Sequence, residues 1–114
     1  MPNVLFALSD GVPVGTATYV FETQMKFRHI AEIYGFYVSP GYRGRGIGTR
    51  LLEAALTRIR RKKGIMKVKL EANAEQLAAI GVYKRAGFVV AGKFEKDMKV
   101  GRRFYARVFM EKIL

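Results

Sequence analysis

The segment from Val38 to Thr49 contains the residues that are best suited to bind a ligand. Its sequence is Val-Ser-Pro-Gly-Tyr-Arg-Gly-Arg-Gly-Ile-Gly-Thr. Glycines stand at alternate positions, 44, 46 and 48, where they let the backbone turn freely and approach a ligand closely. A helix is predicted to begin at Ile47, and the first turn of a helix presents unpaired N–H groups at the positive end of its dipole. Because Arg43 and Arg45 add positive charge, the segment predicts a cradle for a phosphate or pyrophosphate.

The common nucleotide-binding motifs do not match this segment. A Walker loop requires Gly-Lys-Ser/Thr after four spacer residues, and no such run is present. A dinucleotide-binding loop has the spacing G-x-G-x-x-G, whereas the spacing here is G-x-G-x-G. The acidic residue expected about 20 positions further on is also missing, since residues 61–69 are basic, apolar or glycine.

The charge of the chain points to an anionic ligand or partner. Its 114 residues include 21 Lys and Arg against 9 Asp and Glu, which gives a net charge of +12. The positive electrostatic potential of such a protein favours the binding of polyanions, nucleotides and phosphate-rich cofactors. The absence of cysteine excludes thiol chemistry, and a single histidine excludes a multi-histidine metal site. We expect no metal, and Glu95 and Asp97, which lie among lysines, to balance charge rather than bind a cation.

The pattern of apolar residues predicts one α/β domain, with a mixed sheet and helices packed on it, over residues 1–114. No linker or repeat interrupts it. No run of about 20 apolar residues or signal peptide is present, so we expect a cytoplasmic protein without a membrane partner. The order is β-β-β-α-β-α-β-β, with strands at 3–8, 14–21 and 31–38, a helix from 47 closed by Gly64, a strand at 65–71, a helix at 75–86, and strands at 88–94 and 104–113 around a basic turn.

Two motifs resemble the GNAT superfamily of acetyl-CoA-dependent N-acetyltransferases. The first is Arg43-x-x-Gly46-x-Gly48 after a strand that ends at Val38, which is similar to the family's acyl-CoA pyrophosphate loop. The second, residues 79–88, reads Ala-Ile-Gly-Val-Tyr-Lys-Arg-Ala-Gly-Phe and is similar to the family's A-I-x-L-Y-x-x-x-G-F. The resemblance runs from about residue 4 to residue 114 and implies a GNAT-like fold.

The resemblance also implies how acetyl-CoA is bound. The pantetheine arm pairs with the strand backbone at Phe36, Tyr37 and Val38, and the thioester enters a gap between this strand and the strand at 65–71. Tyr83 matches the tyrosine that protonates the departing CoA thiolate. Gln76 stands where many relatives have an asparagine that contacts the cofactor, and the nearby Asn73 is an alternative. The pyrophosphate lies on the backbone N–H groups of Gly44, Arg45, Gly46, Ile47, Gly48 and Thr49.

The sequence departs from the family at its N-terminus, because the usual domain begins with a strand and two helices before the first predicted hairpin. Those helices normally form a wall of the acceptor site. Three alternatives follow. A second subunit supplies the wall, the acceptor is large and needs an open site, or the protein binds CoA without useful turnover. A homodimer that covers the apolar surface is the expectation we favour.

The predicted reaction is direct attack of a primary amine on the acetyl thioester, and it needs a base. Glu71 stands where the resembling ribosomal-protein N-terminal acetyltransferases place a catalytic glutamate, and Glu32 stands where other branches place theirs. The alternative interpretation of each residue is an ordinary glutamate that faces solvent or forms a salt bridge. Strand backbone N–H groups near Tyr37 and Val38 are expected to hold the oxyanion.

Two classes of function therefore remain open. The first is an N-acetyltransferase whose acceptor is a protein N-terminus, a lysine or a small-molecule amine. The second is a non-catalytic module on the same fold that binds CoA, nucleic acid or an acidic protein, with Arg102, Arg103, Phe104 and Tyr105 as basic and aromatic contacts. The positive field disfavours strongly cationic acceptors and suits a protein terminus on an anionic assembly such as a ribosome.

Overall fold

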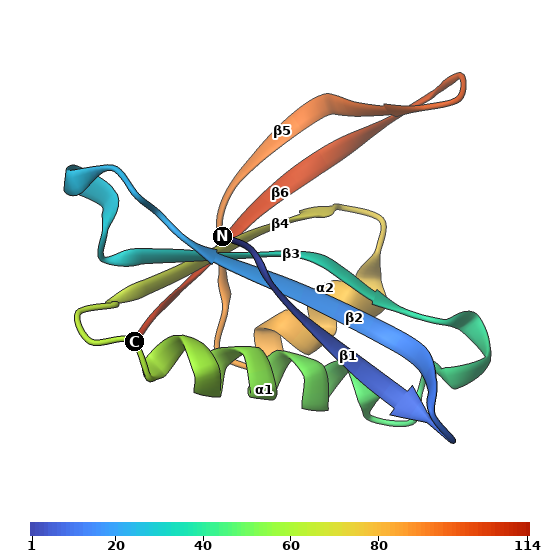
Figure 1. Cartoon of the computed structure of the whole chain (residues 1–114). Coiled ribbons are helices and arrows are strands. Elements are labelled where there is room, and N and C mark those ends of the chain that lie inside the picture. Colours follow the sequence, from blue (N-terminus) through green and yellow to red (C-terminus); the bar gives the residue numbers. More distant parts are fainter.

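A computed structural model describes residues 1–114 as a six-stranded mixed sheet with two α-helices (Figure 1). The strands lie side by side in the order β1-β2-β3-β4-β6-β5. The succession of strands and helices along the chain matches the predicted order. The elements are β1 (Asn3–Ser9), β2 (Val12–Phe21), the short 3-10 helix η1 (Met25–Phe27), β3 (Ile30–Val38), the 3-10 helix η2 (Pro40–Tyr42), α1 (Ile47–Arg60), β4 (Lys67–Asn73), α2 (Leu77–Arg85), β5 (Val89–Val100) and β6 (Arg103–Ile113).

The core lies between one face of the sheet and the two helices. The apolar side of α1 repeats at helical spacing, so that Leu52, Leu56 and Ile59 are almost fully buried against the strands. Ile80 and Tyr83 of α2 belong to the same cluster, which places both helices on one face. In Figure 1 the long α1 runs below the sheet. Burial of this apolar surface is the main force that holds the helices on the strands.

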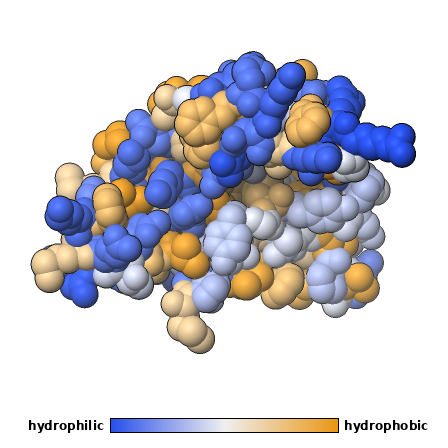
Figure 2. Space-filling view, turned by 90° about the horizontal axis from the view of Figure 1, so that it is seen from above, coloured by the Kyte–Doolittle hydropathy of each residue, from blue (hydrophilic) through white to orange (hydrophobic).

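The opposite face of the sheet carries charged side chains. Along β4 the buried Val68, Leu70 and Ala72 alternate with residues that are partly or fully exposed, as the twofold period of a strand requires. Figure 2 looks down on the molecule from the side opposite α1 and shows hydrophilic side chains with apolar ones between them. The edge strand β1 exposes Val4, Phe6 and Leu8, each by about half or more. Whether a second copy covers this edge stays a prediction.

Several boundaries differ from those predicted. The strand predicted at 88–94 continues to Val100, because a bulge at residues 95–97 interrupts its pairing and then the strand resumes. The helix α1 ends at Arg60, so Gly64 is not its C-terminal stop and lies in the following turn at a φ of 91°. The fourth strand begins at Lys67 rather than at 65, and residues 25–27, between the second and third strands, form a turn of 3-10 helix. No helix combines the length and the apolar character needed to cross a bilayer.

Candidate active site

The strands β3 and β4 pair over a short stretch and then separate. Their parallel pairing covers only three positions, and the last pair is Glu32 with Lys69. Beyond it β3 continues to Val38 and β4 continues to Asn73 without pairing to each other. The opening contains a cavity of about 340 Å³. This is the gap that the resemblance predicts between these two strands. A ligand that enters it can reach the backbone of β3 and β4.

A β-bulge shapes β3 where it lines the cavity. Opposite β2, Tyr34 pairs with Thr18 and Tyr37 pairs with Thr16, so that one residue of β2 faces both Gly35 and Phe36. Gly35 has a φ of 61°, which an L side chain rarely adopts. A bulge leaves a residue outside the regular ladder and bends the strand. Backbone at Gly35 and Phe36, both of which line the cavity, is therefore presented to a ligand.

The glycine-rich segment lies directly after β3 and leads into α1. Gly44 and Gly46 have φ angles of 76° and 79°, and Gly46 is the N-cap residue of the helix. The first hydrogen bond of the helix runs from the Arg50 N–H to the Gly46 carbonyl, so the N–H groups of residues 47–49 have no acceptor within it. The N–H groups of residues 44–46 donate to no backbone carbonyl either. This geometry is that of an anion cradle.

The two arginines of this segment hold its shape. The Arg43 Nε donates to the carbonyl of Val38 at 2.8 Å, and its guanidinium lies 5.4 Å from the centre of the Tyr37 ring. Arg45 stacks in the same way on Tyr42, at 5.1 Å. Cation–π contacts of this kind are worth about 0.5–1 kcal/mol at exposed sites. Both arginines remain exposed to solvent and can contact an anion.

Gly48 allows α1 to approach β3 closely. A Cβ added to Gly48 would lie 3.3 Å from Cζ of Phe36 and 3.8 Å from Cγ2 of Val38. A side chain at this position would therefore require the Phe36 ring to shift by a few tenths of an ångström. Gly48 thus serves this packing, whereas Gly44 and Gly46 serve the turn.

Tyr83 of α2 lines the cavity from the helix side. It is only 5% exposed, and burial raises the pKa of its phenol from 10.0 to about 12. Its ring meets Phe36 edge to face at 5.3 Å and Phe88 at 6.3 Å. These contacts hold the ring in place. Because its pKa is raised, the hydroxyl keeps its proton at neutral pH and is a hydrogen-bond donor.

Glu32 and Glu71 both line the cavity, one from β3 and the other from β4. Partial burial raises the pKa of the Glu32 carboxyl, and the negative charges of Glu71 and Glu22 raise it further, whereas Lys69 opposes them. The structure thus brings together the two glutamates between which the sequence did not decide. A carboxylate whose proton affinity is raised is better suited to accept a proton than an ordinary surface carboxylate.

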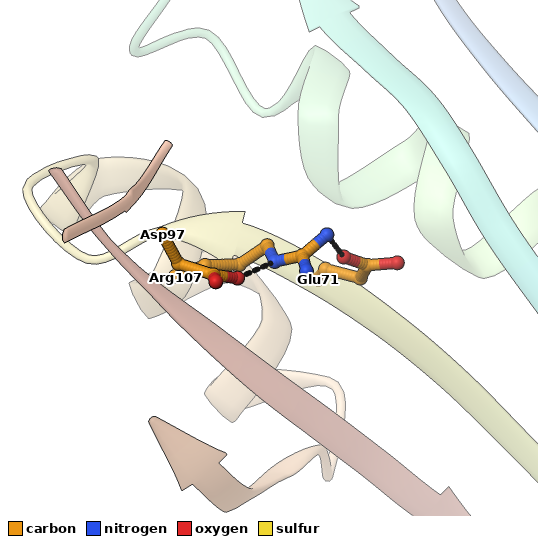
Figure 3. A network of polar contacts seen from close by, with 3 residues as sticks. All are labelled: Glu71, Asp97 and Arg107. Atoms are coloured by element: carbon orange, nitrogen blue, oxygen red, sulfur yellow. Dashed lines mark hydrogen bonds and ion pairs between the residues drawn. The ribbon is translucent and has the colours of Figure 1, made fainter. Parts of the chain in front are cut away.

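Arg107 of β6 was not singled out in the sequence, and it joins two acidic residues at this site (Figure 3). Its Nη1 donates to Oε2 of Glu71 and its Nε donates to Oδ2 of Asp97, both at 2.6 Å. The sequence marks Arg107 only as a charged residue on the polar side of a strand. The pairing depends on the register of β4 against β6, which places Asn73 opposite Arg107.

The acidic residues on β5 balance positive charge, as predicted. Asp97 is paired with Arg107, and Glu95 lies 3.2 Å from the ammonium of Lys93. No group of three or more His, Asp and Glu side chains is arranged to hold a metal ion.

The amide side chains before α2 have different surroundings. The Oδ1 atom of Asn73 accepts a hydrogen bond from the Glu75 N–H at 2.9 Å, which builds the turn into the helix. Gln76 is the N-cap residue of α2, but its side chain makes no capping bond. It is exposed and lines the cavity. Both amides line the cavity, and that of Gln76 makes no hydrogen bond within the protein; its contact with the cofactor stays a prediction.

Residues 2–88 match the model of the acetyltransferase (GNAT) family. With this match over most of its length, together with its fold, the chain belongs to the GNAT family. An uncharacterised N-acetyltransferase of Methanocaldococcus jannaschii is 38% identical over 81 residues, which are 69% of this chain and 35% of the relative. The chain thus spans about a third of that curated relative's length.

Solved structures agree with this assignment. The ribosomal-protein-alanine N-acetyltransferase of Brucella melitensis is 33% identical with a TM-score of 0.82, over 97% of this chain and 68% of the other. The protein yncA of Salmonella typhimurium, solved with its cofactor acetyl-CoA, is 26% identical with a TM-score of 0.87, over 97% and 64%. An acetyltransferase of Streptococcus pneumoniae reaches a TM-score of 0.91 at 23% identity, over 97% and 66%, and shows the likeness of fold.

Proposed function

We propose that this chain carries an acetyl-CoA-dependent N-acetyltransferase activity that acetylates a primary amine by direct attack. The observation that carries the proposal is the separation of β3 and β4 after Glu32 and Lys69. The resulting cavity is lined by the buried Tyr83 and by Phe36, whose ring packs against Gly48 at the start of α1. A solved neighbour that contains acetyl-CoA supports the choice of cofactor.

Each part of the cofactor, from the pyrophosphate to the pantetheine arm, has residues of this chain that would bind it. The backbone N–H groups of residues 44–49 would hold the pyrophosphate, since they lack acceptors and two glycines open the turn. The exposed Arg43 and Arg45 would add charge beside it. The backbone of residues 36–38 would pair with the pantetheine amides, and Gln76 would contact the arm from α2. When bound, the cofactor supplies an acetyl group on a thioester and a thiolate as leaving group.

Proton transfer to the leaving group is assigned to Tyr83. The new bond joins the amine nitrogen to the acetyl carbon, and the bond to sulfur breaks. The nitrogen becomes positively charged on attack and loses one proton, while the sulfur takes one from Tyr83, which regains a proton from that nitrogen through solvent. With a pKa of about 12, the Tyr83 phenol is protonated at neutral pH and donates a hydrogen bond to the departing sulfur, and its proton is transferred only as the proton from the nitrogen replaces it. Backbone N–H groups near Tyr37 and Val38 would stabilise the charge that develops on the acetyl oxygen.

Glu32 is the base that we favour. A lysine-type ammonium has a pKa of about 10.4, so its deprotonation at pH 7 costs roughly 4–5 kcal/mol. Glu32 has a raised pKa and makes no ion pair within 4.0 Å, whereas an oxygen of Glu71 is held by Arg107 at 2.6 Å. Glu32 would accept the proton of the amine. Glu71 would add negative charge that attracts an ammonium group to the cavity.

The proposal is tested by measuring thiol release from acetyl-CoA with three classes of acceptor. These are peptides with a free N-terminal amine, peptides with an internal lysine and a blocked N-terminus, and small-molecule amines. Amine-dependent release that yields the acetylated product by mass spectrometry supports the proposal. Acetyl-CoA binding without turnover on any class would instead support a non-catalytic CoA-binding module.

A further inference from the structure

One end of the molecule brings together two basic segments that lie far apart in the sequence. The first is the loop of residues 22–29, which contains η1, and the second runs from residue 58 at the end of α1 to residue 66. The Lys62 Nζ lies 4.3 Å from the centre of the Phe21 ring, beside the first segment. The Met66 N–H donates to the His29 carbonyl at 2.8 Å. Figure 1 shows both segments at the left, away from the start of α1.

These segments carry positive charge that no ion pair neutralises, since their one acidic residue, Glu22, lies 3.8 Å from the ammonium of Lys69 on β4. No Asp or Glu occurs between Glu22 and Glu32 or between Glu53 and Glu71. All six ion pairs of the molecule use other cations, on β4, β5 and β6. We call the group the basic end; its seven cations, all exposed, are Lys26, Arg28, Arg58, Arg60, Arg61, Lys62 and Lys63.

The basic end is separate from the phosphate cradle. The cradle lies at the N-terminus of α1 and the basic end at its C-terminus, and this helix of 14 residues is about 21 Å long. Cations in the last turn of a helix are favoured by its dipole, but that accounts for Arg58 and Arg60 alone. A bound cofactor at the cradle would leave the charge of the basic end uncompensated.

Two exposed apolar side chains lie within the first segment. Met25 is 83% exposed and Phe27 is 45% exposed, beside Lys26 and Arg28. Cations that contact phosphates and apolar or aromatic surfaces that contact unstacked bases are the combination used for single-stranded nucleic acid. The β5–β6 hairpin is a weaker candidate. Residues 89–104 hold five cations but also Glu95 and Asp97, which leaves +3.

We propose that the basic end binds the phosphodiester backbone of single-stranded nucleic acid, with Phe27 stacking on a base. The mutual repulsion of seven unpaired cations is relieved when phosphates replace their counterions, and the released counterions drive binding. This inference does not depend on the proposed transferase function, because the surface lies at the far end of α1. Binding is therefore expected with or without saturating acetyl-CoA.

The test is fluorescence anisotropy of a labelled 20-mer oligouridylate at increasing KCl concentrations. The variant Arg60→Gln/Arg61→Gln/Lys63→Gln removes three exposed cations of the basic end. It should bind at least 10-fold more weakly at low salt, and the slope of log affinity against log salt should fall by about 2. Phe27→Ala should weaken binding to the single strand about 5-fold or more without changing duplex binding.

The matched control is Lys84→Gln/Lys99→Gln/Arg102→Gln, which removes three exposed cations from α2 and the hairpin. It lowers the net charge by the same amount but should change the affinity less than threefold. Equal losses in the two triple variants would mean a diffuse field and would overturn the proposal. So would tighter binding to an RNA duplex or to vesicles containing anionic lipid than to the oligouridylate. Thermal melting monitors that each variant is folded.

Discussion

The ring of Tyr83 on α2 meets the ring of Phe36 on β3 edge to face, with 5.3 Å between their centres. Phe36 also lies where a Cβ on Gly48 of α1 would touch it, at 3.3 Å. One aromatic side chain of β3 therefore contacts both the helix that carries the tyrosine and the helix that follows the glycine-rich segment. Phe36 thus links the position of Tyr83 to the start of α1.

Replacing Tyr83 by Phe removes the hydroxyl and keeps the aromatic contacts. We expect kcat for acetyl transfer to fall about 100-fold, the scale of general acid catalysis, while acetyl-CoA affinity changes little. The affinity is measured by calorimetry and the rate by thiol release. Tyr19→Phe is the matched control, since Tyr19 is equally buried but lies away from the cavity. Comparable rate losses in both variants would argue against a role in catalysis.

The raised pKa of Tyr83 has a signature of its own. The phenol has a pKa of about 12 in the folded protein against 10.0 as its ordinary value, so the folded state binds this proton more tightly. Stability is therefore expected to fall as the pH rises from about 10 towards 12. A titration of phenolate absorbance should show one late tyrosine that is absent from Tyr83→Phe. A wild-type titration identical in shape to that of the variant, apart from amplitude, would contradict this.

Glu32 predicts a pH dependence in the acidic range. Burial raises the pKa of its carboxyl above the ordinary value of 4.5, so the folded state holds this proton more tightly than the unfolded chain does. The contribution of Glu32 to stability is therefore greatest at low pH and is lost as the pH rises through this range. Glu32→Gln, which carries no charge, should melt at a higher temperature relative to wild type at pH 7 than at pH 4.

The control for this prediction is Glu53→Gln on the exposed side of α1. Its difference in melting temperature from wild type should vary less with pH. If Glu32 is the base, Glu32→Gln should also lose most of its turnover at pH 7 and the acidic limb of its rate profile. An unchanged kcat would assign the base elsewhere, with Glu71→Gln as the next variant to measure.

Arg107 is expected to act as a positioning residue for the acceptor side of the cavity. It ties Glu71 of β4 to Asp97 in the bulge of β5, and Met98, which follows, lines the cavity. Arg107→Met should raise KM for the amine about 3- to 10-fold while acetyl-CoA affinity stays the same. Arg107→Lys should recover only part of this effect, because one ammonium group cannot reproduce the fork of a guanidinium.

The control for Arg107 is Arg103→Met, which breaks an exposed ion pair with Glu75 outside the cavity. An exposed pair of this kind contributes only about 0–1 kcal/mol, so this variant should behave as wild type. A rise in KM of the same size in Arg103→Met would show that the effect on the amine is not specific to the network of Figure 3.

The cradle is tested by two substitutions at Gly46, whose φ is 79°. Asn and Asp both tolerate this conformation better than other residues and both cap a helix, so Gly46→Asn and Gly46→Asp should fold equally well. Only the aspartate places a negative charge against the pyrophosphate. Calorimetry should show at least a 10-fold greater loss of acetyl-CoA affinity for Gly46→Asp than for Gly46→Asn. Equal affinities would move the phosphate site away from this helix terminus.

The element order and the glycine-rich turn before α1 could both be predicted from the amino-acid sequence. Both follow from local physics: the spacing of apolar residues selects strand or helix, and glycines at positive φ allow the turn. The motif around Tyr83 placed that residue on a helix before Phe88, as observed. The predicted end of the strand at residue 94 was wrong, because β5 resumes after a bulge. Lys96 lies in this bulge at a φ of 51°, a conformation that is typical of turns.

Which charged side chains pair with one another depends on how the strands are arranged in the folded protein. Glu71, Asp97 and Arg107 come from three strands, and their contacts depend on the pairing of β4 with β6 and on the bulge in β5. The difference between Glu32 and Glu71 likewise depends on burial and on neighbouring charges, which arise only when β3 and β4 lie side by side and then separate. Residue spacing along a chain specifies its local geometry, whereas the register between strands specifies which side chains become neighbours.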